Sequence, residues 1–116
     1  MKRILFAFML CGAACGATAG VRAAGVNADI EYLLLKVQQS PCEFQRNGSV
    51  YTGEQAARHL RQKLAAAPAG IDVEQFISRI ASKSSISGKP YLVRCTPDDV
   101  QPSEVWLHDR LRERRG

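Results

Sequence analysis

Apolar residues recur at helical spacing in the stretch ADIEYLLLKVQQS, which follows Asn27. Asn27 is a favourable N-cap residue, and Pro41 cannot continue a helix, so the pattern predicts a helix between them. The apolar stripe expected to face the core consists of Ile30, Leu33, Leu34 and Val37.

The next stretch, CEFQRNGSVYT, alternates in character on both sides of an Asn-Gly dipeptide that begins at Asn47. This dipeptide tolerates the positive φ angles of a two-residue turn, so the stretch predicts a β-hairpin. In that hairpin Phe44 would face Tyr51, and Arg46 would face Ser49. The same Asn-Gly-Ser tripeptide also matches an N-glycosylation acceptor, although the turn accounts for it without glycosylation.

A capping pattern formed by Thr52 and Gln55 opens the stretch GEQAARHLRQKLAAA, and Pro68 and Gly70 end it. The pattern predicts a second helix with a narrow apolar face of small residues. That face consists of Ala56, Ala57, Leu60 and Leu64.

A second capping pattern, Asp72 with Gln75, predicts a third helix over VEQFISRIASK. Its buried side would consist of Val73, Phe76, Ile77 and Ile80. The stretch PYLVRC is typical of a strand, and PSEVWLHDRL predicts a last helix from near Ser103. The expected apolar contacts of this helix are Trp106, Leu107 and Leu111.

The start of the chain has the three parts of a secretory signal peptide. Basic residues Lys2 and Arg3 precede an uncharged run that extends to Val21, and small residues follow as candidates for cleavage. We expect residues 1–19 to be removed, with cleavage as late as residue 24 as an alternative.

Two other fates of the leader are weaker. An uncleaved membrane anchor is disfavoured because Gly12, Gly16 and Gly20 dilute the apolar run. Lipid attachment at Cys15 would need a larger apolar residue in place of Gly12. We therefore predict an exported chain whose residues 25–113 form a single small α+β domain.

Removal of the leader takes away Cys11 and Cys15 and leaves Cys42 and Cys95. In an oxidising compartment these two residues predict one disulfide, which contributes about 4 kcal/mol in the chain-entropy model. Free thiols are the alternative. Redox-active pairs usually have closer spacing, and a metal site needs more ligands than two cysteines and two histidines supply, so no metal is expected.

The cysteines also indicate how the strands pair, because Cys42 would begin the first strand and Cys95 would end the third. The sequence predicts an α+β fold with about four helices packed on a small three-stranded antiparallel sheet and one disulfide. Helices would cover the sheet face that carries Cys42, Phe44, Tyr51, Tyr91, Val93 and Cys95.

The formal net charge of +5 includes two charges from the leader. The remaining surplus permits attraction to anionic lipid, glycan or nucleic acid without requiring it. Export argues against a nucleic-acid partner, and we expect contact with the membrane only through the transient signal peptide.

The serine-rich stretch SKSSISGKP, residues 82–90, raises the question of a phosphate-binding loop. A Walker-type loop needs glycine five residues before Gly88, where Lys83 stands, and serine or threonine where Pro90 stands. The stretch also follows a helix instead of preceding one. We interpret it as a connector, with a backbone nest in which Lys89 holds an anion as the alternative.

Three stretches carry a resemblance to a known family: FQRNGSVYTGEQAARHLRQKL, IDVEQFISRIASKSSISGKPYLV and QPSEVWLHDRL. Together they resemble the YfeK-like family of small exported bacterial proteins, a domain of unknown function. The resemblance covers residues 30–111, and RNG, HLR.K and S.SGKPY are its specific elements. It implies a periplasmic protein of a Gram-negative bacterium and no known activity, substrate or catalytic residue.

The weak candidate for a catalytic residue is His59, because an imidazole titrates near neutral pH and could activate water or a serine. It would lie beside Lys63 at the edge of an apolar stripe, where a histidine is more often a packing residue. His108 and Asp109 are adjacent and would diverge on a helix, which makes them a poor catalytic dyad. Trp106 is interpreted as a core residue.

Charged and aromatic side chains could instead bind a ligand, although solvated surface charge is the simpler explanation. Arg58 follows Glu54 by four residues, which predicts a surface ion pair that Arg61 could join. The terminal arginines could extend a cationic surface. The candidate binding residues are Arg46, His59, Arg61, Lys63, Lys89 and Tyr91.

We therefore expect a periplasmic binding or accessory module without catalytic activity or cofactor. Its partner would be an anionic envelope polymer or a protein. The alternative is a small periplasmic hydrolase that uses His59 as general base.

Overall fold

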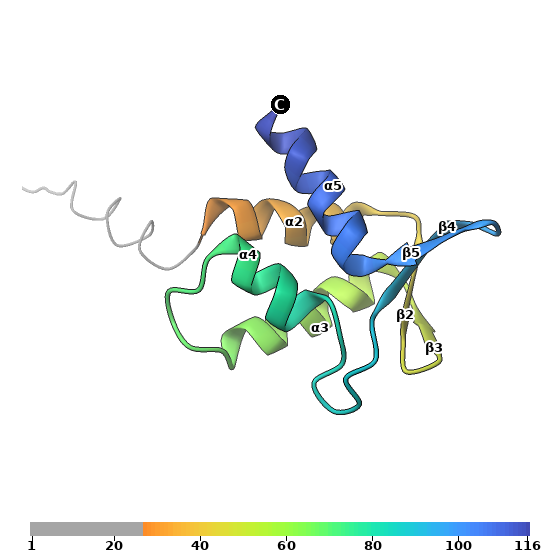
Figure 1. Cartoon of the computed structure of the whole chain (residues 1–116), viewed down its shortest axis with the longest axis horizontal. Helices are drawn as coiled ribbons and strands as arrows, with labels where there is room; N and C mark the ends of the chain where they lie inside the picture. Colours follow the sequence, from red (N-terminus) through yellow and green to blue (C-terminus); the bar gives the residue numbers. More distant parts are fainter. Residues whose placement is uncertain (1–26) are drawn as a thin grey trace, which may run out of the picture.

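A computed structural model describes residues 27–116, so the predicted signal peptide lies outside the described residues. The elements of Figure 1 follow in chain order. They are α2 (Ala28–Gln39), β2 (Glu43–Arg46), β3 (Ser49–Tyr51), α3 (Gly53–Ala65), α4 (Val73–Gln75), the π-helix η2 (Phe76–Ala81), β4 (Leu92–Thr96), β5 (Asp99–Pro102) and α5 (Ser103–Arg115).

The caps predicted from the sequence set the starts of three helices. The side chain of Asn27 accepts hydrogen bonds from the backbone N–H groups of Asp29 and Ile30 at the start of α2. Full capping boxes open α3, through Thr52 and Gln55, and α4, through Asp72 and Gln75.

The third predicted helix differs from an ordinary α-helix. After the single turn α4, the chain continues as the π-helix η2. Phe76, Ile77, Ile80 and Ala81 are all buried there. One turn of a π-helix contains more residues than one turn of an α-helix. The two adjacent apolar pairs, Phe76 with Ile77 and Ile80 with Ala81, can therefore both face the core.

The sheet has four strands, in the order β3-β2-β4-β5, and all pairs are antiparallel. The predicted pairs Phe44 with Tyr51 and Arg46 with Ser49 are confirmed. The prediction of three strands missed β5, which pairs with β4. Its Asp99 and Pro102 are poor strand formers, and both are tolerated because β5 is an edge strand.

The sheet face that carries Phe44 and Val93 is covered by helices, as predicted from the sequence, and both residues are buried. Figure 1 shows α2, α3 and α5 gathered beside the sheet, while the β4–β5 hairpin extends away from them. Trp106 of α5 lies edge-on to Phe44, with ring centroids 5.6 Å apart. The predicted role of Trp106 as a core residue is therefore confirmed.

Close packing between α2 and α3 depends on the glycine at position 53. A Cβ atom on Gly53 would lie 2.2 Å from the Val37 carbonyl oxygen and 2.8 Å from that of Ser40. The start of α3 thus contacts the backbone at the end of α2 at a distance that only glycine permits.

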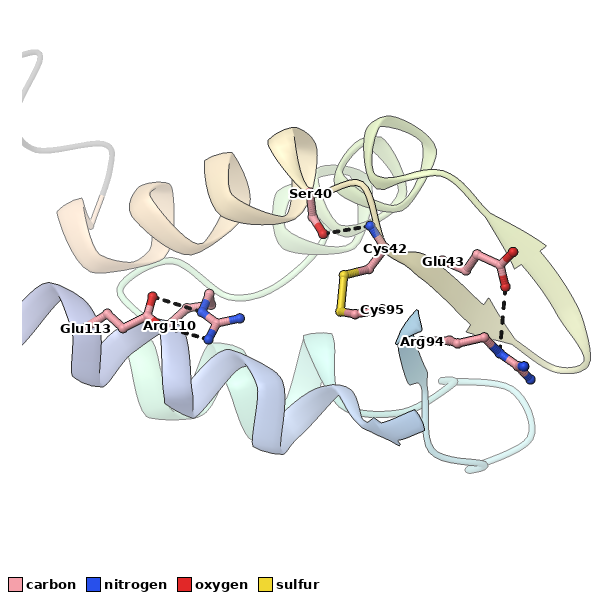
Figure 2. The surroundings of a disulfide bond; sticks show 7 residues. All are labelled: Ser40, Cys42, Glu43, Arg94, Cys95, Arg110 and Glu113. Carbon is pink, nitrogen blue, oxygen red and sulfur yellow. Dashed lines mark hydrogen bonds and ion pairs between the residues drawn. A yellow bond between two sulfur atoms is a disulfide. The ribbon is translucent and has the colours of Figure 1, made fainter. Parts of the chain in front are cut away.

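The predicted disulfide between Cys42 and Cys95 is present, with Cα atoms 4.3 Å apart (Figure 2). The pairing of Phe44 with Val93 puts the two cysteines at opposite positions just beyond the paired residues of β2 and β4. The bond therefore links the chain just before β2 to the neighbouring strand β4.

Candidate functional site

A cavity of about 260 Å³ lies between α3 and the β2–β3 hairpin. Its apolar floor includes Phe44, Ala56 and Leu60. Its polar wall holds cationic, amide and phenolic side chains. The polar lining residues are Gln45, Arg46, Tyr51, Gln55, Arg58, His59, Gln62 and Tyr91.

Helical periodicity explains one wall of this cavity. Gln55, Arg58, His59 and Gln62 follow the spacing i, i+3, i+4 and i+7 along α3, so they form one stripe beside the apolar face. The opposite wall comes from the hairpin, where Arg46 and Tyr51 point to the same side as the buried Phe44. The two walls bring the two arginines to one cavity.

Arg46 is the half-buried charge at the centre of the site. One of its Nη atoms donates to Tyr51 Oη at 3.0 Å, and the guanidinium lies 4.9 Å from the centre of the Tyr51 ring. The other Nη atom lies 3.4 Å from His59 Nε2. No carboxylate in residues 27–116 forms an ion pair with Arg46 or Arg58.

His59 faces its neighbours through Nε2. This nitrogen lies near Arg46 and 3.3 Å from Tyr91 Oη. Arginine can only donate hydrogen bonds, so the arrangement requires Nε2 to accept and assigns the proton of the neutral ring to Nδ1. Burial, followed by the charges of Arg46 and Lys63, lowers the pKa of His59 below its ordinary value.

Lys63 lies behind Tyr91 and has a structural role. Its Nζ donates to Ile80 O at 2.8 Å, Lys83 O at 3.1 Å and Tyr91 Oη at 3.0 Å. All three ammonium donors are thus used, one of them on a carbonyl in the last turn of η2 and one on a carbonyl of the loop that follows. Burial is the main cause that lowers the pKa of Lys63 and raises the pKa of Tyr91.

The six predicted binding residues do not all lie at one site. Arg46, His59 and Tyr91 line the cavity, and Lys63 supports Tyr91 from behind. Arg61 instead forms a two-point ion pair with Glu31 of α2, at 3.0 and 2.8 Å. Lys89 is exposed in the loop that precedes β4 and is not among the residues that line the cavity.

The ion pair predicted between Glu54 and Arg58 is wrong. Arg58 forms no ion pair with any described carboxylate, and its side chain lines the cavity. The cavity residues Gln45, Gln55 and Gln62 were also missed. Gln55 and Gln62 could have been identified from their spacing in the α3 stripe, and Gln45 from its position next to Arg46 in the hairpin.

The serine-rich loop uses its polar groups internally. Ser84 is buried, and its Oγ accepts from the N–H groups of Ile86 and Ser87. Ser87 Oγ accepts from the Lys89 N–H, and Ser84 O accepts from the Gly88 N–H. The N–H groups of Ile86, Ser87, Gly88 and Lys89 therefore already have partners, which fits the interpretation of this loop as a connector.

Charged residues at the C-terminus form ion pairs instead of a free cationic surface. Arg114 and Arg115 contact Asp29 at 2.7 and 3.2 Å. His108 lies 2.8 Å from Glu74 and away from Asp109, which pairs with Arg112. In the part of the chain described by the structure, no cluster of histidine, cysteine and acidic residues could hold a metal ion.

A second hollow, of about 630 Å³, lies between the start of α2 and the segment that follows α3. It is larger, but its lining is mainly alanine, proline, glycine and aliphatic side chains. Its charged residues, Glu31 and Arg61, neutralise each other. The cavity at Arg46 is therefore the better candidate site, because its charge has no internal partner.

These features define a small α+β protein with one disulfide and a cationic cavity beside its hairpin. A family model described as a family of unknown function (DUF5329) matches residues 24–115, and the chain belongs to this family. It is also 41% identical over 95 residues to the "Uncharacterized protein YfeK" of Salmonella typhimurium.

The aligned region covers 78% of this chain and 77% of that protein. The resemblance to the YfeK-like family, predicted from the three sequence stretches, is therefore confirmed. No solved structure matches the chain. Within residues 27–116, no helix is long and apolar enough to span a bilayer.

Proposed function

We propose that this protein is an exported, non-catalytic binding module that holds an anionic group in the cavity at Arg46. The observation that carries the proposal is a half-buried guanidinium without a carboxylate partner, in a cavity whose polar lining contains two arginines and no acidic residue. Charges that are withdrawn from water are usually paired, and because the lining offers Arg46 no acidic partner, a ligand can supply the counter-charge.

The chemistry of the lining favours a carboxylate or phosphate on a larger envelope molecule. Arg46 and Arg58 present planar donor groups that suit both anions. The amides of Gln45 and Gln62 can donate to or accept from neighbouring hydroxyl or amide groups of the ligand. A cavity of about 260 Å³ accommodates one such group of a polymer better than a large free ligand.

The hydrolase alternative has less support in this geometry. A general base needs a free lone pair, whereas His59 Nε2 is directed at Arg46 and Tyr91. The cavity lining also contains no serine, cysteine or carboxylate that could act as a nucleophile. Binding therefore uses the observed arrangement without rearranging it.

The proposed compartment is the periplasm, with residues 1–19 shed during export and residues 25–113 as the mature domain. The disulfide supports an oxidising environment, because such bonds are uncommon in the bacterial cytosol. Mass spectrometry of the protein from a periplasmic extract should show a chain that begins between residues 20 and 25 and is lighter by two hydrogens. An intact leader with reduced thiols would contradict this part of the proposal.

Calorimetry of the mature protein with sulfate, phosphate and oxalate as probe anions tests the binding site. We expect saturable binding that Arg46→Gln weakens by about tenfold or more, with a smaller loss for Arg58→Gln. Arg79→Gln is the matched control, because Arg79 is exposed on η2 and the change in net charge is the same. Equal loss in the Arg79 variant, or no binding by the wild type, would contradict the proposed site.

A further inference from the structure

His59 lies in the wall of the cavity, where it contacts the residue that would hold the anion. Its ring centroid is 6.2 Å from that of Tyr91, and its Nε2 lies 3.4 Å from Arg46. An anion at Arg46 would therefore bind next to an imidazole. The charge state of that imidazole must affect the binding free energy.

The groups around His59 oppose its protonation in the free protein. They come from β2, β3, α3 itself and the segment before β4, and none of them carries a negative charge at neutral pH. The titratable and charged groups that face the ring or line its cavity are Arg46, Tyr51, Arg58, Lys63 and Tyr91. Burial, followed by the positive charges of Arg46 and Lys63, disfavours the protonated imidazole.

A bound anion would reverse this balance. It neutralises the positive charge of Arg46 and attracts the guanidinium away from the imidazole. His59 Nε2 then no longer has to accept a hydrogen bond from Arg46. A protonated Nε2 could then donate to Tyr91 Oη. That oxygen accepts one bond from Lys63 Nζ at 3.0 Å and has a second lone pair available.

We infer that anion binding in the Arg46 cavity is coupled to the uptake of a proton by His59, so that the site holds its anion more tightly in mildly acidic solution than at neutral pH. This inference rests on the proposed function. It adds a regulation of the same site that the arginines alone would not produce, because they stay charged throughout this range.

Sulfate is a suitable probe because its own charge does not change between about pH 5.5 and pH 8. We expect its Kd for the mature protein to fall with decreasing pH, with a slope that approaches about tenfold per pH unit at most. Calorimetry in buffers of different ionisation enthalpy should show proton uptake on binding. Binding that is independent of pH, without proton uptake, would overturn the coupling and leave the binding site itself intact.

Two histidine variants test which residue takes up the proton when sulfate binds. His59→Gln keeps a hydrogen-bonding side chain without a titration, and we expect it to bind sulfate with a nearly constant Kd. His108→Gln is the control, since His108 pairs with Glu74 on α4 outside the cavity. A pH dependence that persists in His59→Gln, or disappears in His108→Gln, would contradict the assignment.

Imidazole proton spectra of the wild type give a measurement that does not depend on a variant. We expect saturating sulfate to raise the pKa of His59 and to leave the ring signals of His108 in place. An unchanged titration of His59 while sulfate binds would overturn the coupling. Failure of sulfate to bind at all would overturn both this inference and the proposed function.

Discussion

Asn47 donates a hydrogen bond from its side-chain amide to Ser84 Oγ at 3.2 Å, although the two residues lie 37 positions apart. The amide oxygen of Asn47 accepts a second bond from Ser87 Oγ at 2.6 Å. The turn of the β2–β3 hairpin is thus attached to the serine-rich loop. Two of the stretches on which the predicted resemblance to the YfeK-like family was based, RNG and S.SGKPY, meet at this contact.

This contact predicts that Asn47→Gly will loosen the loop without straining the turn. Asn47 has a φ of 51°, which glycine adopts freely, so the variant removes the side chain alone. We expect a loss of about 1 kcal/mol in the free energy of unfolding and faster amide exchange at Ile86 and Ser87. Ser85→Ala is the control, because Ser85 is exposed in the same loop. Unchanged exchange in the Asn47 variant would contradict the prediction.

The disulfide predicts a large loss of stability on reduction. Cys42 and Cys95 are 53 residues apart, so their bond removes much conformational freedom from the unfolded chain. We expect the double variant Cys42→Ser, Cys95→Ser to lose about 4 kcal/mol in urea unfolding. Reductant should destabilise the wild type by a similar amount and leave the double variant unaffected. If reductant destabilised both proteins equally, the loss of stability could not be attributed to reduction of this disulfide.

The contact between α2 and α3 predicts that Gly53→Ala is strongly destabilising. The added methyl group would collide with the carbonyl oxygens of Val37 and Ser40, which belong to backbone and cannot move aside alone. We expect a loss of about 2 kcal/mol or more in the free energy of unfolding. Glu54→Gln, at the next and exposed position, should change stability little. If the two variants had similar free energies of unfolding, α2 and α3 could move apart at small energetic cost.

The sequence predicted the elements whose local signals agree with their tertiary role. Asn47 occupies a positive φ as the hairpin required, and the caps at Asn27, Thr52 and Asp72 start helices where expected. The disulfide then fixed the pairing of β2 with β4. This long-range relation was predictable because loss of the predicted leader leaves two cysteines, one just before β2 and one near the end of β4.

Other features depend on tertiary contacts that leave no local pattern. The strand β5 contains Asp99 and Pro102, and its formation depends on pairing with β4. Arg61 pairs with Glu31 on another helix and Arg58 lines the cavity, so the spacing of Glu54 and Arg58 predicted an ion pair that does not form. The cavity combines residues from α3 and the hairpin, and helical spacing alone could identify only its α3 wall.

The lowered pKa of His59 predicts how stability changes with pH in the absence of ligand. The unfolded chain takes up a proton at this residue near its ordinary pKa of 6.5, whereas the folded protein does so only at lower pH. The free energy of unfolding should therefore decrease as pH falls from about 6.5 toward the folded pKa, and be fully retained above this window.

Urea unfolding at several pH values above about 5 measures this effect. In that range the titration of carboxylates contributes little, because groups such as Glu31, whose pKa is lowered by its hydrogen bond to Arg61, take up protons only at lower pH. We expect His59→Gln to lose most of the pH dependence in this window and His108→Gln to retain it. Saturating sulfate should also reduce the dependence in the wild type, because an anion at Arg46 stabilises the imidazolium of the folded protein. A wild type whose stability rises as pH falls through this window would contradict the placement of His59 among cations.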